Sequence, residues 1–102
     1  MSFKRKPTYD LEKIKKAFNN VNKLVMTATA KQDQISLDFS DQDVVNTIQN
    51  LRATDFYKSM APVTQGFTAW QDVYKSTFGG IELYIKFQIN FNKELILSFK
   101  EK

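Results

Sequence analysis

Apolar and polar residues alternate without a break between Ile81 and Phe91. The odd-numbered positions hold Ile, Leu or Phe, and the even-numbered positions hold Glu, Tyr, Lys, Gln or Asn. Successive side chains of a β-strand point to opposite faces of the sheet, so this pattern predicts an antiparallel strand with one buried and one open face. Tyr84 and Lys86 would then lie on the open face.

The residues from Leu95 to Lys100 predict the second strand of a hairpin. Residues opposite each other across an antiparallel pair share a face, so buried positions must pair with buried positions. A two-residue loop would pair Phe91 with Glu94 and mismatch every pair that follows. A three-residue loop over residues 92–94 pairs Phe91 with Leu95 instead, and we expect this register.

The expected register has a consequence for charge on the open face. It places Lys86 opposite Lys100, with Tyr84 one step beyond. Two like charges facing each other are unfavourable unless an anion lies between them. The hairpin therefore predicts a phosphate-binding position at Lys86, and at least one lysine pKa lowered by the neighbouring positive charge.

Helical spacing characterises the first half of the chain. After Pro7 we expect a helix with Thr8 as its N-cap, because apolar residues recur there at intervals of three and four: Leu11, Ile14, Phe18 and Val21. A capping-box pattern beginning at Thr29 predicts a second, short helix that ends near Ser36. Ser40 and Asp43 resemble a capping box for a third helix, from about residue 41 to residue 52.

Two further strands are expected between the helices and the hairpin, over residues 56–60 and 67–75, with a turn at Gly79-Gly80. Helices followed by an antiparallel meander predict an α+β fold, with the N-terminal helices packed on one face of the sheet. At 102 residues, the chain is expected to form one domain spanning residues 1–102.

Composition restricts the chemistry. The chain has no His and no Cys, so proton transfer must fall to Lys, Tyr, carboxylates or amides, and a cysteine-based metal site or disulfide is excluded. No apolar run has the length of a membrane span, and no signal segment is evident at the N-terminus. A cytoplasmic protein without a membrane partner is therefore expected.

The net charge of +4 is unevenly distributed along the chain. Residues 1–23 hold seven Lys or Arg against two acids, residues 24–57 hold two against five, and residues 58–102 hold six against four. A basic N-terminal helix and a basic C-terminal sheet are suited to phosphate-rich partners, although a solvated charged surface has a similar pattern.

Four separated motifs give the chain a resemblance to a known family. They are DFYKSM at residues 55–60, WQDVY at 70–74, LYIK at 83–86 and SFKEK at 98–102. In this order they closely resemble the MqsR family of bacterial messenger-RNA interferases, which are toxins of type II toxin–antitoxin pairs. The resemblance covers most of the chain but is concentrated in its second half.

The resemblance implies a RelE-like fold and cleavage of mRNA without a metal or other cofactor, preferentially at sites containing 5′-GC. The family's active-site residues fall on Lys58, Gln71, Tyr84 and Lys100. The implied partner is an antitoxin with a zinc-binding N-terminal region and a helix-turn-helix C-terminal region. The toxin would reach operator DNA only through this antitoxin.

The chemistry of RNA agrees with these residue types. The 2′-hydroxyl can attack the adjacent phosphorus, which leaves a 2′,3′-cyclic phosphate and a 5′-hydroxyl. This reaction needs a proton acceptor, a proton donor and cations near the transition state. One of Lys58, Lys86 and Lys100 could accept the proton, Tyr84 could donate one, and Gln71 would orient the phosphate or the 2′-hydroxyl.

Other interpretations remain open from the sequence. A lone Tyr or Lys on a sheet face is usually plain surface, and Trp70 and Tyr74 are better explained as core than as base-stacking residues. Four aspartates between residues 33 and 43 suggest a metal site only weakly, since Asp43 is explained as a helix N-terminal acid. A non-enzymatic RNA- or DNA-binding module is the alternative function, followed by a plain protein-interaction domain.

Overall fold

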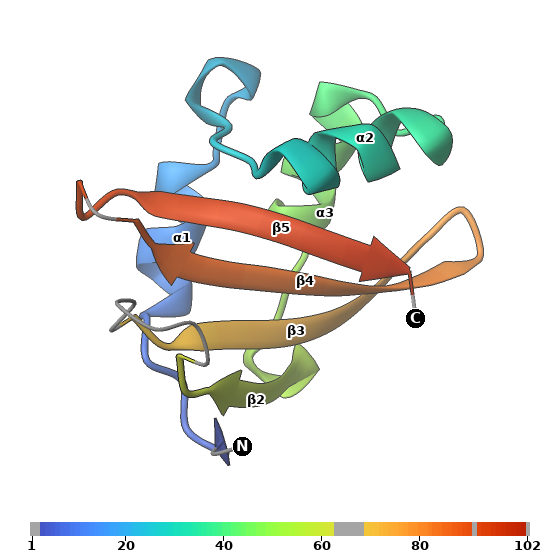
Figure 1. The fold of residues 1–102 in the computed structure, drawn as a ribbon. Helices are drawn as coiled ribbons and strands as arrows, with labels where there is room; N and C mark the ends of the chain where they lie inside the picture. Colours follow the sequence, from blue (N-terminus) through green and yellow to red (C-terminus); the bar gives the residue numbers. More distant parts are fainter. Residues whose placement is uncertain (1–2, 63–68, 91, 102) are drawn as a thin grey trace.

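The sheet is a simple antiparallel meander. The computed structural model describes residues 3–62, 69–90 and 92–101 (Figure 1). Within them, five strands pair in sequence order, each antiparallel to the next. They are β1 (Phe3–Lys4), β2 (Phe56–Met60), β3 (Gln71–Phe78), β4 (Ile81–Ile89) and β5 (Leu95–Glu101).

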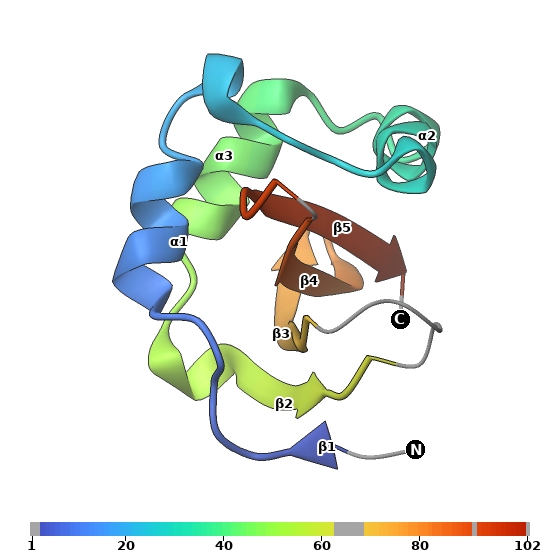
Figure 2. The same cartoon turned by 60° about the vertical axis from the view of Figure 1, so that its left-hand side comes forward.

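The α-helices precede β2 along the chain. They are α1 (Leu11–Ala17), α2 (Ala28–Ser36) and α3 (Asp41–Gln49), with short 3-10 turns at Val21–Lys23 and Ala53–Asp55. Figures 1 and 2 show α1 and α3 over one face of the sheet and α2 running beside β5. The predicted α+β fold with an antiparallel sheet is thus confirmed, and none of the described helices is long and apolar enough to cross a membrane.

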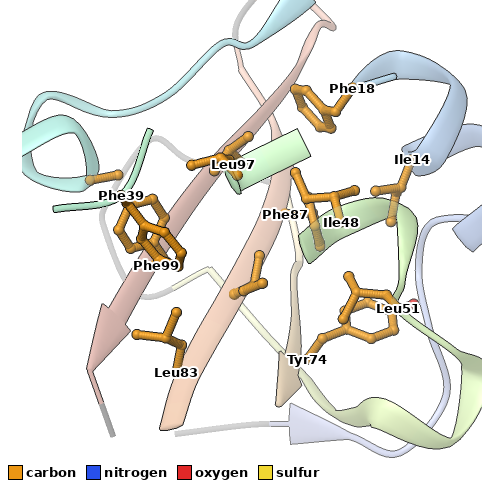
Figure 3. Close-up of a cluster of buried hydrophobic side chains, with 13 residues drawn as sticks. Ile14, Phe18, Phe39, Ile48, Leu51, Tyr74, Leu83, Phe87, Leu97 and Phe99 are labelled. Atoms are coloured by element: carbon orange, nitrogen blue, oxygen red, sulfur yellow. The ribbon is translucent and has the colours of Figure 1, made fainter. Parts of the chain in front are cut away.

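The core lies between α1, α3 and the inner face of β3–β5 (Figure 3). The apolar positions of the alternating pattern point inward as expected, and Leu83, Ile85 and Phe87 are buried. From the helices, Ile14 and Ile48 pack against them, and neither has any exposed surface. One apolar face of each strand therefore joins the core, and the other face remains free for a site.

The helix starts agree with the expectations only in part. The capping box of Ser40 and Asp43 is confirmed, and its helix ends at Gln49, earlier than expected. Asp10, not Thr8, caps α1, and Thr27, not Thr29, caps α2. Several Thr and Asp residues near each start can accept an N-terminal hydrogen bond, so composition alone does not identify the one that does.

Thr8 does not cap α1, because its hydroxyl is hydrogen-bonded to the Ser59 hydroxyl at 2.9 Å. Its N–H donates to both carboxylate oxygens of Asp72, at 3.0 and 2.9 Å, and the N–H of Tyr9 donates to the same carboxylate at 2.9 Å. The Tyr9 hydroxyl then donates to the carbonyl of Trp70 at 2.7 Å. Asp72, fully buried in β3, thereby anchors the segment that leads into α1.

The expected register of the last hairpin is wrong by two residues. Leu95 pairs with Ile89, while the predicted partner, Phe91, lies outside the described residues. The turn is closed by Asn90, whose N–H donates to the carbonyl of Glu94 at 2.9 Å and whose side-chain oxygen accepts from Glu94 N–H at 3.0 Å. Lys93 adopts a positive φ of 61° there. The turn therefore begins earlier than predicted, but a shift of two residues leaves every side chain on its expected face.

Strand limits elsewhere were largely predictable. The strand at Phe56–Met60 is confirmed, and the turn at Gly79-Gly80 has positive φ values of 54° and 82°, which glycine adopts without strain. The third strand extends to Phe78, beyond its expected end at residue 75. It begins at Gln71, so residues 69 and 70 lie outside the strand that was predicted to include them, and the predicted start at Phe67 lies outside the described residues.

Candidate active site

The open face of the sheet brings the candidate residues together in two rows. In the first row Lys58 pairs with Val73, Val73 with Lys86, and Lys86 with Ser98. In the second row Lys75 pairs with Tyr84, and Tyr84 pairs with Lys100.

The prediction that Lys86 faces Lys100 directly is therefore wrong. Tyr84 faces Lys100 instead, and Lys86 is the diagonal neighbour of Lys100. The prediction that all three side chains share one face of the hairpin is confirmed by the pairing, because the shift by two residues preserves the alternation.

A hollow of about 330 Å³ opens on this face. Of the expected residues, Lys58, Tyr84, Lys86 and Lys100 line it, together with Tyr57, Met60, Val73 and Glu101. Gln71 is also on this face, since it precedes Val73 by two residues on β3 and pairs with Met60. It is not among the lining side chains, so the structure brings four of the five expected residues into one concavity and leaves Gln71 beside it.

Lys86 has the most perturbed environment of these lysines. It lies on the central part of β4 and is partly buried. Burial lowers its pKa from the ordinary value, and the positive charges of Lys100 and Lys58 lower it further. The expectation that one lysine of the group has a lowered pKa is confirmed, with loss of solvation as the larger cause.

Tyr57 is a site residue that the sequence pattern does not reveal. Strict alternation would place it on the opposite face from Lys58, but the pairing of β2 with β3 is irregular between Phe56 and Lys58. The Tyr57 ring stacks on that of Tyr84, with centroids 5.8 Å apart and planes 20° apart. The ammonium groups of Lys75 and Lys58 lie 4.3 and 5.0 Å from the Tyr57 ring centroid. A β-bulge has no reliable sequence signature here, which explains the omission.

Two aromatic residues of the WQDVY motif lie away from this face. Tyr74 is buried in the core as predicted, and burial together with the nearby carboxylate of Asp72 raises the pKa of its hydroxyl to about 12. Trp70 is partly buried, with the Lys4 ammonium 4.6 Å from its ring centroid. Neither ring lines the hollow.

The aspartates of the α2–α3 region have local structural partners. Asp43 completes the capping box of α3, and Asp41 accepts from the Lys31 ammonium at 2.8 Å and from Gln34 at 2.7 Å. These two hydrogen bonds lower the pKa of the Asp41 carboxyl. Across the described ranges, no three His, Cys, Asp or Glu side chains are grouped so as to hold a metal ion.

The lining of the hollow determines what it can bind. Three lysines, two tyrosines and Glu101 line it together with the apolar side chains of Val73 and Met60. Ammonium groups neutralise a phosphate, and a Tyr hydroxyl can donate a proton or a hydrogen bond to an oxygen. Stacked aromatic rings next to cations are also a common feature of surfaces that bind single-stranded nucleic acid.

Comparison with known proteins gives two findings. Residues 6–101 match the sequence model of a family described as "Motility quorum-sensing regulator, toxin of MqsA". The chain is also 36% identical over 100 residues to the mRNA interferase toxin MqsR of Escherichia coli (strain K12), across 97% of this chain and 98% of that protein. The resemblance drawn from four motifs is therefore confirmed over nearly the whole chain.

Proposed function

Because the chain belongs to the MqsR toxin family, we propose that it is an mRNA interferase, an endoribonuclease acting as the toxin of a toxin–antitoxin pair. Residues 1–102 would act as a single toxin domain. The observation that carries this proposal is the hollow on the open face, which Lys58, Lys86 and Lys100 line together with Tyr84. Three lysines and a tyrosine in one concavity suit a phosphodiester better than an uncharged substrate.

The proposed reaction uses the substrate's own 2′-hydroxyl as the nucleophile. Lys58 and Lys100 bind the scissile phosphate and stabilise the charge that develops on its oxygens. Tyr84 donates a proton to the departing 5′-oxygen, and Gln71 orients the phosphate or the 2′-hydroxyl from the edge of the hollow. The products are a 2′,3′-cyclic phosphate and a 5′-hydroxyl, and no step calls for a metal ion.

Substrate and partner follow from family membership. The substrate is single-stranded mRNA, with sites containing 5′-GC preferred. The partner is an antitoxin with a zinc-binding region and a helix-turn-helix region, and the toxin reaches operator DNA only through it. The net charge of +4 and the basic open face support attraction to RNA at moderate salt concentration.

The test is cleavage of a single-stranded RNA containing one GC site by the purified protein in EDTA. We expect fragments with 2′,3′-cyclic phosphate ends. Tyr84→Phe keeps the ring that stacks on Tyr57 but lacks the hydroxyl, so this variant should cut the RNA much more slowly than the parent protein. A requirement for a divalent metal, or 3′-hydroxyl ends, would contradict the mechanism. Tight RNA binding without cleavage would instead support a non-enzymatic binding module.

A further inference from the structure

Lys86 occupies the middle of the candidate site. On β4 it pairs with Val73 on one side and Ser98 on the other, and its side chain lines the hollow. It is partly buried, whereas Lys100 is exposed. Among the described residues, no hydrogen bond or ion pair holds the Lys86 ammonium.

The charged and titratable groups around Lys86 are predominantly basic or neutral. Lys58 lies across Val73 in the same row, and Lys100 is its diagonal neighbour. The remaining groups that line the hollow or adjoin it are Tyr57, Lys75, Tyr84 and Glu101, of which only Glu101 is acidic. Burial and the two lysine charges disfavour the charged form of Lys86 and lower its pKa.

The other two lysines of the hollow have different surroundings. The Lys58 ammonium lies 5.0 Å from the ring centroid of Tyr57 and 5.7 Å from that of Phe3, and the faces of aromatic rings attract a cation. Lys100 is exposed to water. Lys86 is partly buried, and its pKa is lowered by that burial and by the neighbouring lysine charges.

We propose that Lys86 is the general base of the site, a role that rests on the proposed ribonuclease function. Its neutral amine takes the proton of the 2′-hydroxyl as the bond from the 2′-oxygen to phosphorus forms. The bond from phosphorus to the 5′-oxygen breaks, and that oxygen takes a proton from Tyr84. Lys86 ends the reaction as an ammonium and Tyr84 as a phenolate, and exchange with water restores both. The sequence alone assigned Lys86 only to phosphate binding.

Lys86→Arg separates the two roles because arginine keeps the positive charge but stays protonated at every accessible pH. Binding is measured with an RNA that carries a 2′-deoxy sugar at the cleaved position, and cleavage is measured as a single-turnover rate. We expect Lys86→Arg to bind this RNA as the parent protein does and to cut normal RNA about 10²- to 10⁴-fold more slowly. Lys13→Arg, at an exposed position of α1 away from the open face, is the matched control and should change neither quantity.

The pH profile gives the second readout. The parent rate should rise with pH as Lys86 loses its proton, and this rising limb should be absent from Lys86→Arg. Should arginine prevent folding, Lys86→Ala replaces it, and added methylamine should restore part of its rate, increasingly at higher pH.

Two results would overturn the assignment of Lys86. One is a Lys86→Arg rate within about threefold of the parent with the rising limb retained, which would leave Lys86 a phosphate-binding residue. The other is a folded Lys86→Ala variant that no amine rescues. A parent protein that cuts no RNA would refute the proposed function itself, and is thus distinguished from a failure confined to Lys86.

Discussion

Asp72→Asn should destabilise the protein substantially while leaving the shape of the side chain almost unchanged. Asp72 is fully buried in β3, and the N–H groups of Thr8 and Tyr9 both donate to its carboxylate. With its oxygen at the Oδ2 position, asparagine still accepts from both N–H groups, but as a neutral acceptor. Its NH₂ group then takes the Oδ1 position, 3.0 Å from the Thr8 nitrogen, so two donors face each other there.

The expected magnitude follows from these contacts. A hydrogen bond to a charged group contributes about 1.5–3 kcal/mol, and one between neutral groups about 0.5–1.5 kcal/mol. Since two hydrogen bonds lose their charged acceptor and the contact of Thr8 N–H with Oδ1 becomes repulsive, we expect the free energy of unfolding to fall by about 2–4 kcal/mol.

The assay is urea unfolding at neutral pH, followed by circular dichroism, for the parent, Asp72→Asn and Asp10→Asn. Asp10 caps α1 by accepting from Glu12 N–H at 3.1 Å, and asparagine is an equally good N-cap. The control should therefore change the free energy of unfolding by less than about 0.5 kcal/mol. An equally small change for Asp72→Asn would refute the reasoning that the carboxylate anchors the segment before α1.

Two further predictions concern the open face. Lys86→Met should raise the thermal unfolding midpoint most at low pH, where Lys86 is charged and the folded protein bears the penalty of burying that charge. The pKa of Lys86 in the folded protein lies below the ordinary 10.5. The stability of the parent protein therefore rises between that pKa and pH 10.5, and the gain in stability from Lys86→Met should shrink over the same range. A gain that does not change with pH would contradict this. Expression without an antitoxin should arrest bacterial growth, and alanine at Lys58, Gln71, Tyr84 or Lys100 should relieve the arrest. If several of these variants fold and remain as toxic as the parent, the site assignment is wrong.

The faces of the strands could be predicted because alternation determines them without knowledge of the partner strand. Tyr84, Lys86 and Lys100 share a face whether the hairpin register is the expected one or the observed one. The register itself was not predictable from the pattern, since it depends on where Asn90 starts the turn. Tyr57 was missed for a related reason, because a bulge reverses the face of a residue without altering the sequence pattern around it.

The helices show the same division between pattern and local detail. The existence of α1 follows from the spacing of apolar residues, and the core positions of Ile14 and Phe18 could be named in advance. The caps could not all be assigned, because the Thr8 hydroxyl is hydrogen-bonded to Ser59, which lies 51 residues further along the chain. Such a contact leaves no trace in local sequence.

The hydrogen bonds from the segment before α1 to Asp72 also bear on the order in which parts of the chain fold. The strands from β2 to β5 each pair with the next strand along the chain, so β4 and β5, and β3 and β4, can form as local hairpins. The backbone N–H groups of Thr8 and Tyr9 have no acceptor until β3 exists, since both donate to Asp72. We therefore expect the hairpins to form early and the N-terminal segment to dock late, although it is synthesised first. Until then the inner face of the sheet stays accessible to solvent, and this interval is when the chain is most exposed to aggregation and proteolysis.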